Sequence, residues 1–123
     1  MNWIGVVFVF LGGGLGSAFR YICSFIIQEK TKTTFPLSTF IVNITGCFLI
    51  GCLSSYFSKN SSSTTTILLF TTGFCGGFTT FSTFGLENVK LIDQQQFAMF
   101  ITYTLLSILL GLLAVYAGLK IIK

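Results

Sequence analysis

The sequence predicts an all-α integral membrane protein with four transmembrane helices. Of the 123 residues, 53% are hydrophobic and only 8% are charged, whereas about a quarter of the residues of a soluble domain are charged. The apolar residues form long blocks rather than amphipathic stripes, which is typical of helices that have lipid as their solvent. The length allows one domain, and we expect residues 1–123 to form a single four-helix transmembrane unit.

The first apolar block runs from about Trp3 to Ile27 and contains one charge, Arg20. Roughly 20 apolar residues suffice to span a bilayer. An arginine near a helix centre costs about 3 kcal/mol on insertion scales, and the many aliphatic residues of the block offset this cost. A cleaved signal peptide is a poor alternative, because no basic residue precedes the apolar stretch and further spans follow it.

The second and fourth blocks read as uninterrupted helices. The second runs from about Leu37 to Phe57, and Asn43 is its one strongly polar residue. The fourth runs from about Phe97 to Leu119, and its residues 103, 107 and 111 are spaced by four and share a helix face.

The third block, about Thr66 to Asn88, has an unusual composition. Three glycines interrupt it, and threonines and a serine then alternate with phenylalanines. Glycine weakens a helix, and β-branched threonine adds little helix preference. We therefore expect the helix to break near Gly76–Thr79. The backbone groups freed at membrane depth must face a cavity, an ion or protein, and freed carbonyls can bind Na⁺.

The basic residues give almost no orientation signal. Three lysines lie in the termini and the second loop, and three lie in the first and third loops: Lys59, Lys120 and Lys123 against Lys30, Lys32 and Lys90. Orientation follows a Lys/Arg bias between the two sides. A chain without bias inserts both ways, which favours a dual-topology protein and an antiparallel dimer; the alternative is that a small bias fixes one orientation.

Composition excludes several functional classes. The basic residues stand singly at the ends of apolar blocks, so the net charge of +4 does not indicate a nucleic-acid partner. The four cysteines form no Cys-x-x-Cys pair and the chain has no histidine, which argues against a zinc site or a redox pair. No nucleophile and base stand together, so we expect no enzyme.

The polar and aromatic residues within the blocks are candidates for an anion path. Arg20 either snorkels to the headgroups or supplies positive charge at the mouth of such a path. Tyr103 and Ser107 offer two hydroxyls in line, although such hydroxyls also bond helix carbonyls. Phe81 and Phe84 are three apart and share a face, and the edge of a phenyl ring carries positive potential that attracts a compact anion.

The chain resembles the Fluc fluoride channels, also called CrcB-like proteins, over nearly its whole length. The resemblance rests on these motifs: Gly12-Gly13-x-x-Gly16 followed by Arg20-Tyr21, Asn43-x-x-Gly46, and above all the run Gly73-Phe74-Cys75-Gly76-Gly77-Phe78-Thr79-Thr80-Phe81-Ser82-Thr83-Phe84. The long third run is the specific part, since a Gly-x-x-x-Gly pair alone carries no information about function.

The resemblance implies a passive fluoride channel that expels fluoride across the cell (inner or plasma) membrane, built as an antiparallel homodimer, or as a heterodimer with a paired homologue, with two pores. It implies a structural Na⁺ at the dimer interface, held by backbone carbonyls at Gly76 and Thr79. It also implies that the fluoride pathway comprises Phe81, Phe84, Asn43, Thr80, Ser82, Tyr103, Ser107 and Arg20. Some relatives have a further hydroxyl where this chain has Gly111, so the end of that polar track stays open.

Two other functions compete with a fluoride channel. A small multidrug-type transporter also has four spans, but it needs a carboxylate within the membrane. The three acidic residues, Glu29, Glu87 and Asp93, are all expected at or near span ends. A non-conducting assembly subunit would explain the small residues, which let helices approach closely, but not the broken third span.

Overall fold

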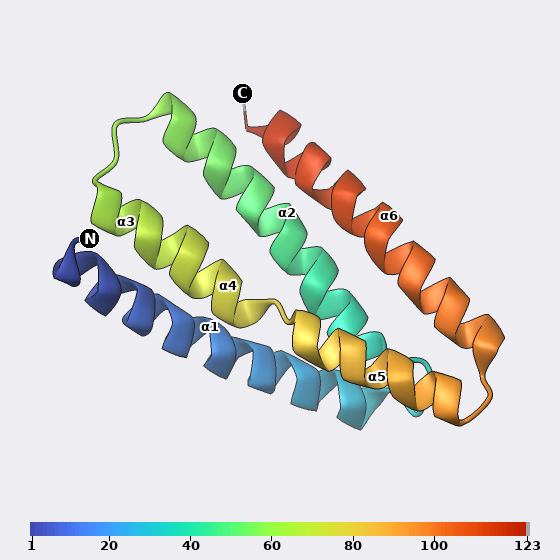
Figure 1. The fold of residues 1–123 in the computed structure, drawn as a ribbon. Coiled ribbons are helices and arrows are strands. Elements are labelled where there is room, and N and C mark those ends of the chain that lie inside the picture. The colour runs from blue at the N-terminus through green and yellow to red at the C-terminus, as the bar shows by residue number, and fades with distance from the viewer. Residues whose placement is uncertain (123) are drawn as a thin grey trace.

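The computed structural model describes residues 1–122, and this part of the chain is helical apart from short turns and one break (Figure 1). The helical elements are α1 (Trp3–Lys30), α2 (Leu37–Lys59), α3 (Thr64–Leu68), the π-helix η1 (Leu69–Cys75), α4 (Gly76–Phe78), α5 (Phe81–Asp93) and α6 (Phe97–Ile121). Within residues 1–122, four stretches are long and apolar enough to cross a membrane, and the third, Thr64–Asp93, comprises α3 to α5. The predicted fold class is therefore confirmed.

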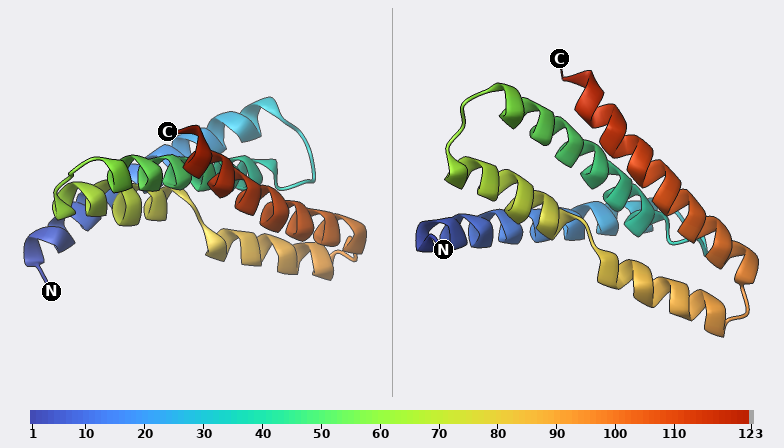
Figure 2. Two further views of the ribbon diagram at one scale, coloured as in Figure 1. Left: turned by 90° about the horizontal axis from the view of Figure 1, so that it is seen from above. Right: turned by 45° about the horizontal axis from the view of Figure 1, so that its top comes forward.

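The four spans run back and forth as two packed pairs. α2 lies against α6, and α1 lies along α3, η1 and α4 (Figures 1 and 2). Both termini and the connection between α2 and α3 lie at one end of the molecule, and the other two connections lie at the opposite end (Figure 1). An even number of spans returns the chain to the side on which it started, and the structure shows this arrangement.

Glycines allow the paired helices to touch backbone to backbone. A Cβ added at Gly12 would overlap the carbonyl oxygen of Leu69, and one at Gly16 would overlap that of Phe74. Between α2 and α6, a Cβ at Gly51 would overlap the carbonyl oxygen of Val115. Small residues allow membrane helices to pack closely, which matters because lipid provides no hydrophobic driving force for their association. Gly12, Gly16 and Gly51 are thus positions where helix packing requires a residue without a side chain.

Gly118 and Gly111 on α6 give a matched test of this packing. A Cβ at Gly118 would overlap the carbonyl oxygen of Phe48 and lie 2.8 Å from the amide nitrogen of Cys52, whereas one at Gly111 meets only Cys47 Sγ at 3.6 Å and Ile44 Cδ1 at 4.0 Å. We expect Gly118→Ala to cost about 1–3 kcal/mol through overpacking, and Gly111→Ala to be nearly neutral. Thermal unfolding of the purified variants in detergent measures the difference. Equal losses of stability would contradict this packing.

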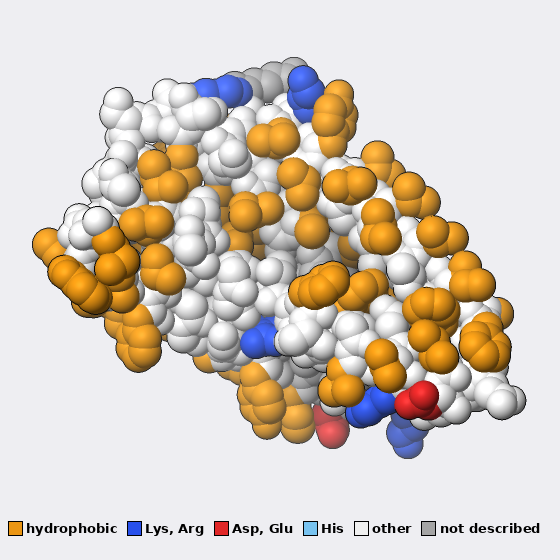
Figure 3. All heavy atoms as spheres, viewed as in Figure 1, with side chains coloured by type: hydrophobic (Ala, Val, Ile, Leu, Met, Phe, Trp, Pro, Cys, Tyr) orange, Lys and Arg blue, Asp and Glu red, His pale blue; other side chains and the backbone are white. Residues whose placement is uncertain are grey.

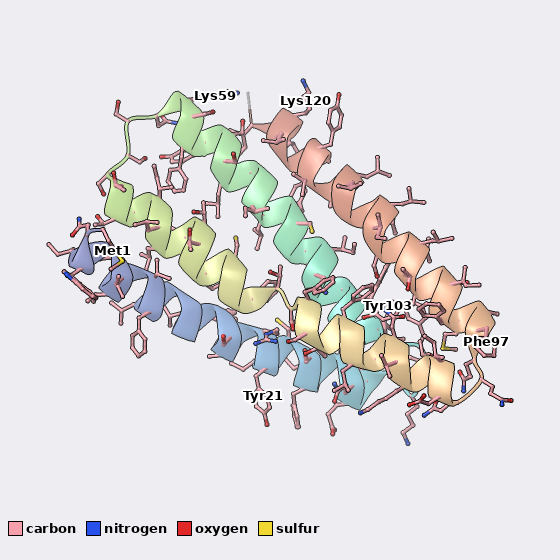
Figure 4. All side chains as sticks on the ribbon, in the orientation of Figure 1. Met1, Tyr21, Lys59, Phe97, Tyr103 and Lys120 are labelled. Carbon is pink, nitrogen blue, oxygen red and sulfur yellow. The ribbon has the colours of Figure 1, made fainter. Side chains whose placement is uncertain are left out.

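The outer faces of the bundle are apolar, as a lipid environment requires. Side chains such as Phe10 and Leu112 are 77% and 67% exposed, and hydrophobic side chains dot the visible face of the helices in Figure 3. Lys59 and Lys120 lie together at the end of the bundle that holds the C-terminus (Figure 4). Apolar flanks with lysines at helix ends are typical of a multi-pass membrane protein, with the lysines at headgroup level.

Candidate functional site

The break in the third span lies at Thr79 and Thr80, which have extended backbones between α4 and α5. The Thr79 hydroxyl donates to the carbonyl oxygen of Cys75 at 2.8 Å. The Thr80 hydroxyl caps the new helix by accepting from the amide of Thr83 at 3.2 Å. Threonine favours such local bonds over a continuing helix. The predicted break is therefore present, at the C-terminal edge of the predicted region.

Gly76 and Gly77 lie directly before the break and are themselves helical. Both lie within α4, a short α-helix. A Cβ at Gly77 would overlap the carbonyl oxygen of Gly13, and Gly76 has no atom within 4 Å of such a Cβ. One glycine thus permits the contact with α1, and the other faces open space. The irregularity before them is the π-helix η1, a feature that often marks functional sites in helices.

Asn43 on α2 joins the two halves of the third span. Its Nδ2 donates to the carbonyl oxygen of Thr80 at 3.0 Å, and its Oδ1 accepts from the Thr80 amide at 2.8 Å. These bonds satisfy backbone groups that lose their helical partners at the break, which is costly to leave undone in a membrane. Asn43 is therefore a structural brace of the break as well as a candidate pathway residue.

A central groove of about 740 Å³ lies between α2, α6 and the broken span. Seven of the predicted site residues line it: Asn43, Gly76, Thr79, Thr80, Phe81, Phe84 and Ser107. Residues far apart in the sequence are thus brought to one place, on three spans. Whether they conduct an anion stays a prediction.

Two features of the central groove indicate that a single chain leaves its surface incompletely covered. Phe81 stands at its edge with 83% of its surface exposed, although its ring centroid is only 5.8 Å from that of Phe84. The Ser107 Oγ is buried and has no hydrogen-bond partner among residues 1–122. A buried polar atom without a partner is costly in a membrane protein, so this hydroxyl is available to a ligand.

Arg20 lies elsewhere, in a second and more polar cavity of about 320 Å³. Its Nε is buried and has no hydrogen-bond partner in the described part of the chain. Thr39, Thr83 and Glu87 line the same cavity, and Thr80 lines both this polar cavity and the central groove. The break therefore lies between a polar cavity lined by Arg20 and a largely apolar groove lined by Phe81 and Phe84.

Tyr103 is completely buried, and it lies between α6 and α5 in Figure 4. Its hydroxyl donates to Glu87 Oε2 at 2.8 Å, and its ring meets the rings of Phe84 and Phe35 edge to face, at centroid distances of 5.1 and 5.3 Å. Tyr103 lines neither the central groove nor the polar cavity. Ser82 also lies outside both, with an exposed side chain whose Oγ is 3.3 Å from that of Thr80.

Glu87 and its second hydrogen-bond partner, Thr39, were not among the site residues predicted from the sequence. The Thr39 hydroxyl donates to Glu87 Oε1 at 2.5 Å. Glu87 lies six residues before the end of α5, Asp93, which is about 9 Å at the rise of an α-helix. Glu87 therefore lies within α5, closer to the C-terminal end of the third span than to its centre, and its place near the end of the membrane-spanning part stays a prediction. The sequence did contain a signal for this residue, because Glu87 follows Thr83 and Phe84 by one helical turn and so shares their helix face.

Backbone carbonyls and threonine hydroxyls are the oxygen ligands that the break itself could offer to a metal ion. Residues 1–122 contain no cluster of three His, Cys, Asp or Glu side chains that could hold a metal ion. A weakly bound alkali ion does not need such a cluster, because carbonyl oxygens suffice. Gly76 is an exposed residue, and both Gly76 and Thr79 line the central groove.

The fold and site define a small four-span membrane protein whose polar groups gather around a broken third helix. The family model described as CrcB-like protein, Camphor Resistance (CrcB) matches residues 7–119. The chain therefore belongs to the CrcB-like protein family.

The chain is also similar to fluoride-specific ion channels of several bacteria over most of their length. The fluoride-specific ion channel FluC of Flavobacterium psychrophilum is 43% identical over 119 residues, which is 96% of each chain. That of Phocaeicola vulgatus is 42% identical, covering 92% of this chain and 93% of the relative. FluC 1 of Ligilactobacillus salivarius is 44% identical over 110 residues, covering 89% of this chain and 92% of the relative.

Proposed function

We propose that this protein is a fluoride channel that lets fluoride leave the cell passively across the cell membrane. The relatives from Flavobacterium psychrophilum and Phocaeicola vulgatus are named fluoride-specific ion channels, and each matches at least 92% of this chain. The observation that carries the proposal is the central groove, where Asn43, Phe81, Phe84 and Ser107 meet at the break. A channel of this kind is not an enzyme.

Permeation would rest on replacing the water around a small, strongly hydrated ion. Hydroxyl and amide groups donate hydrogen bonds to it, and ring edges add positive potential without a full charge. Conduction requires each contact to be favourable enough for entry and weak enough for release. Arg20, in the polar cavity beside Thr80, would attract the anion toward the break.

The pore would be completed by a second subunit. Phe81 is 83% exposed at the edge of a largely apolar groove. An exposed apolar surface of this kind is expected to be covered by protein or lipid. An antiparallel homodimer, or a heterodimer with a paired homologue, would cover both grooves and give two pores. The balance of lysines between the two sides supports insertion in both orientations.

Reconstitution tests this proposal directly. Purified protein in fluoride-loaded liposomes should release fluoride, read with a fluoride electrode, and should release chloride far more slowly. Vesicles that retain fluoride would contradict the channel and favour an assembly subunit. Proton-driven uptake of a cationic drug, without fluoride release, would favour a multidrug-type transporter.

A structural Na⁺ at the subunit interface, near the backbone carbonyls of Gly76 and Thr79, leads to a prediction about salts. Carbonyls of interrupted helices suit Na⁺, and an ion shared by two subunits stabilises the dimer by mass action. We expect purification with N-methylglucamine in place of Na⁺ to lower fluoride flux at least tenfold and to shift the protein toward monomer, with recovery on adding Na⁺ back. The same flux and oligomeric state in both salts would contradict a structural Na⁺.

A further inference from the structure

The carboxylate of Glu87 is held by two hydroxyls from two other spans. Thr39 of α2 donates to Oε1 at 2.5 Å and Tyr103 of α6 donates to Oε2 at 2.8 Å. Both oxygens of Glu87 act as acceptors, so the two hydroxyl groups are directed at this one side chain. Two convergent hydroxyl donors are the makings of an anion site, and here the chain's own anion fills it.

This site lies between the two hollows. Glu87 and Thr39 line the polar cavity together with Arg20. On the other side, the Tyr103 ring packs edge to face against Phe84, which lines the central groove. An anion that moves between the polar cavity and the groove therefore passes close to the donors that Glu87 occupies.

Tyr103 has only one proton to donate. A phenol carries a single O–H, so its hydrogen bond goes either to Glu87 or to a passing anion, and not to both. The Thr39 hydroxyl is under the same constraint. An anion that binds here must displace the carboxylate from its donors, and it also meets the repulsion of that negative charge.

We infer that Glu87 is a built-in competitor that weakens fluoride binding at the Thr39 and Tyr103 hydroxyls and thereby sets the fluoride concentration at which flux saturates. The inference rests on the proposed fluoride channel. A strongly hydrated anion that exchanged its water for hydrogen bonds from two free hydroxyls, beside an arginine, would be held tightly. Competition from the carboxylate keeps the exchange fast, as conduction requires.

Glu87→Gln is the direct test, because it removes the charge and keeps the size. We expect the half-saturating fluoride concentration, measured by flux from liposomes over a range of fluoride, to fall at least fivefold. Glu29→Gln is the matched control, since Glu29 is an exposed carboxylate near the end of α1, and its half-saturating concentration should equal that of the unchanged protein. A purely structural role for Glu87 would lower the maximal flux without moving half-saturation downward.

The possible outcomes separate this inference from the proposed function. Fluoride flux in the unchanged protein, with half-saturation in Glu87→Gln equal to or higher than normal, would overturn the competitor and leave the channel standing. No flux in the unchanged protein would overturn the channel itself. Should Glu87→Gln fail to fold, Glu87→Asp withdraws the carboxylate from its donors by one methylene and should also lower half-saturation. Failure of both variants to fold would assign Glu87 to the structure alone and overturn the inference.

Discussion

Asn43→Asp is expected to reduce fluoride flux at least a hundredfold. The amide of Asn43 both donates to and accepts from the backbone of Thr80, at 3.0 and 2.8 Å. An aspartate keeps the acceptor and loses the donor, so a carboxylate oxygen would face the Thr80 carbonyl oxygen. Leaving a buried polar group unsatisfied costs about 1–3 kcal/mol, and the new negative charge would also stand in the groove proposed for an anion.

The flux assay in liposomes measures this loss, and a second asparagine provides the control. Asn88 is also buried, at 7% exposure, and its Oδ1 accepts from the Thr104 hydroxyl at 3.2 Å. An aspartate at position 88 keeps that bond and lies outside the central groove, so Asn88→Asp should reduce flux far less. Equal losses in the two variants would show that the position of Asn43 has no special role. Normal flux in Asn43→Asp would reduce Asn43 to a packing residue.

Local composition was enough to predict the spans and the region of the break. Four apolar blocks map onto four spans, because lipid imposes a length and a hydrophobicity that each block carries by itself. The Gly/Thr/Phe run likewise predicts an interruption without any knowledge of its neighbours. Most of the candidate site residues meet in the central groove, because helix periodicity fixes which residues on one span share a face.

Contacts between spans were beyond reach of the sequence. Asn43 and Thr80 are 37 residues apart, and Thr39 and Glu87 are 48 apart. Each pairing depends on the depth and rotation at which α2 packs against α5, which no periodicity within one block encodes. The contact of Gly77 with Gly13 of α1, which leaves no room for a Cβ, could not be predicted for the same reason. Tyr103 looked like one of two free hydroxyls in line until its partner on another span was known.

Phe81→Ile is expected to lower fluoride flux at least tenfold while leaving the fold of the subunit unchanged. Phe81 is 83% exposed, so its removal costs the packing of the single chain very little. Isoleucine fills a similar volume but has no aromatic edge, and it is the edge that carries the positive potential. A tenfold loss corresponds to about 1.4 kcal/mol of barrier, which is within the range of a single aromatic interaction.

Two further substitutions decide whether the ring edge is the cause. Phe10 is also an exposed phenylalanine, at 77%, but it lies on the outer face of α1, and Phe10→Ile should leave flux unchanged. Phe84 also packs against Tyr103 at 5.1 Å, so Phe84→Ile should lower both flux and thermal stability. Loss of flux without loss of stability in Phe81→Ile, beside unchanged Phe10→Ile, isolates the ring at the groove. Unchanged flux in both Phe81→Ile and Phe84→Ile would leave the anion path to the hydroxyls and the amide, because no other aromatic side chain lines the central groove within residues 1–122.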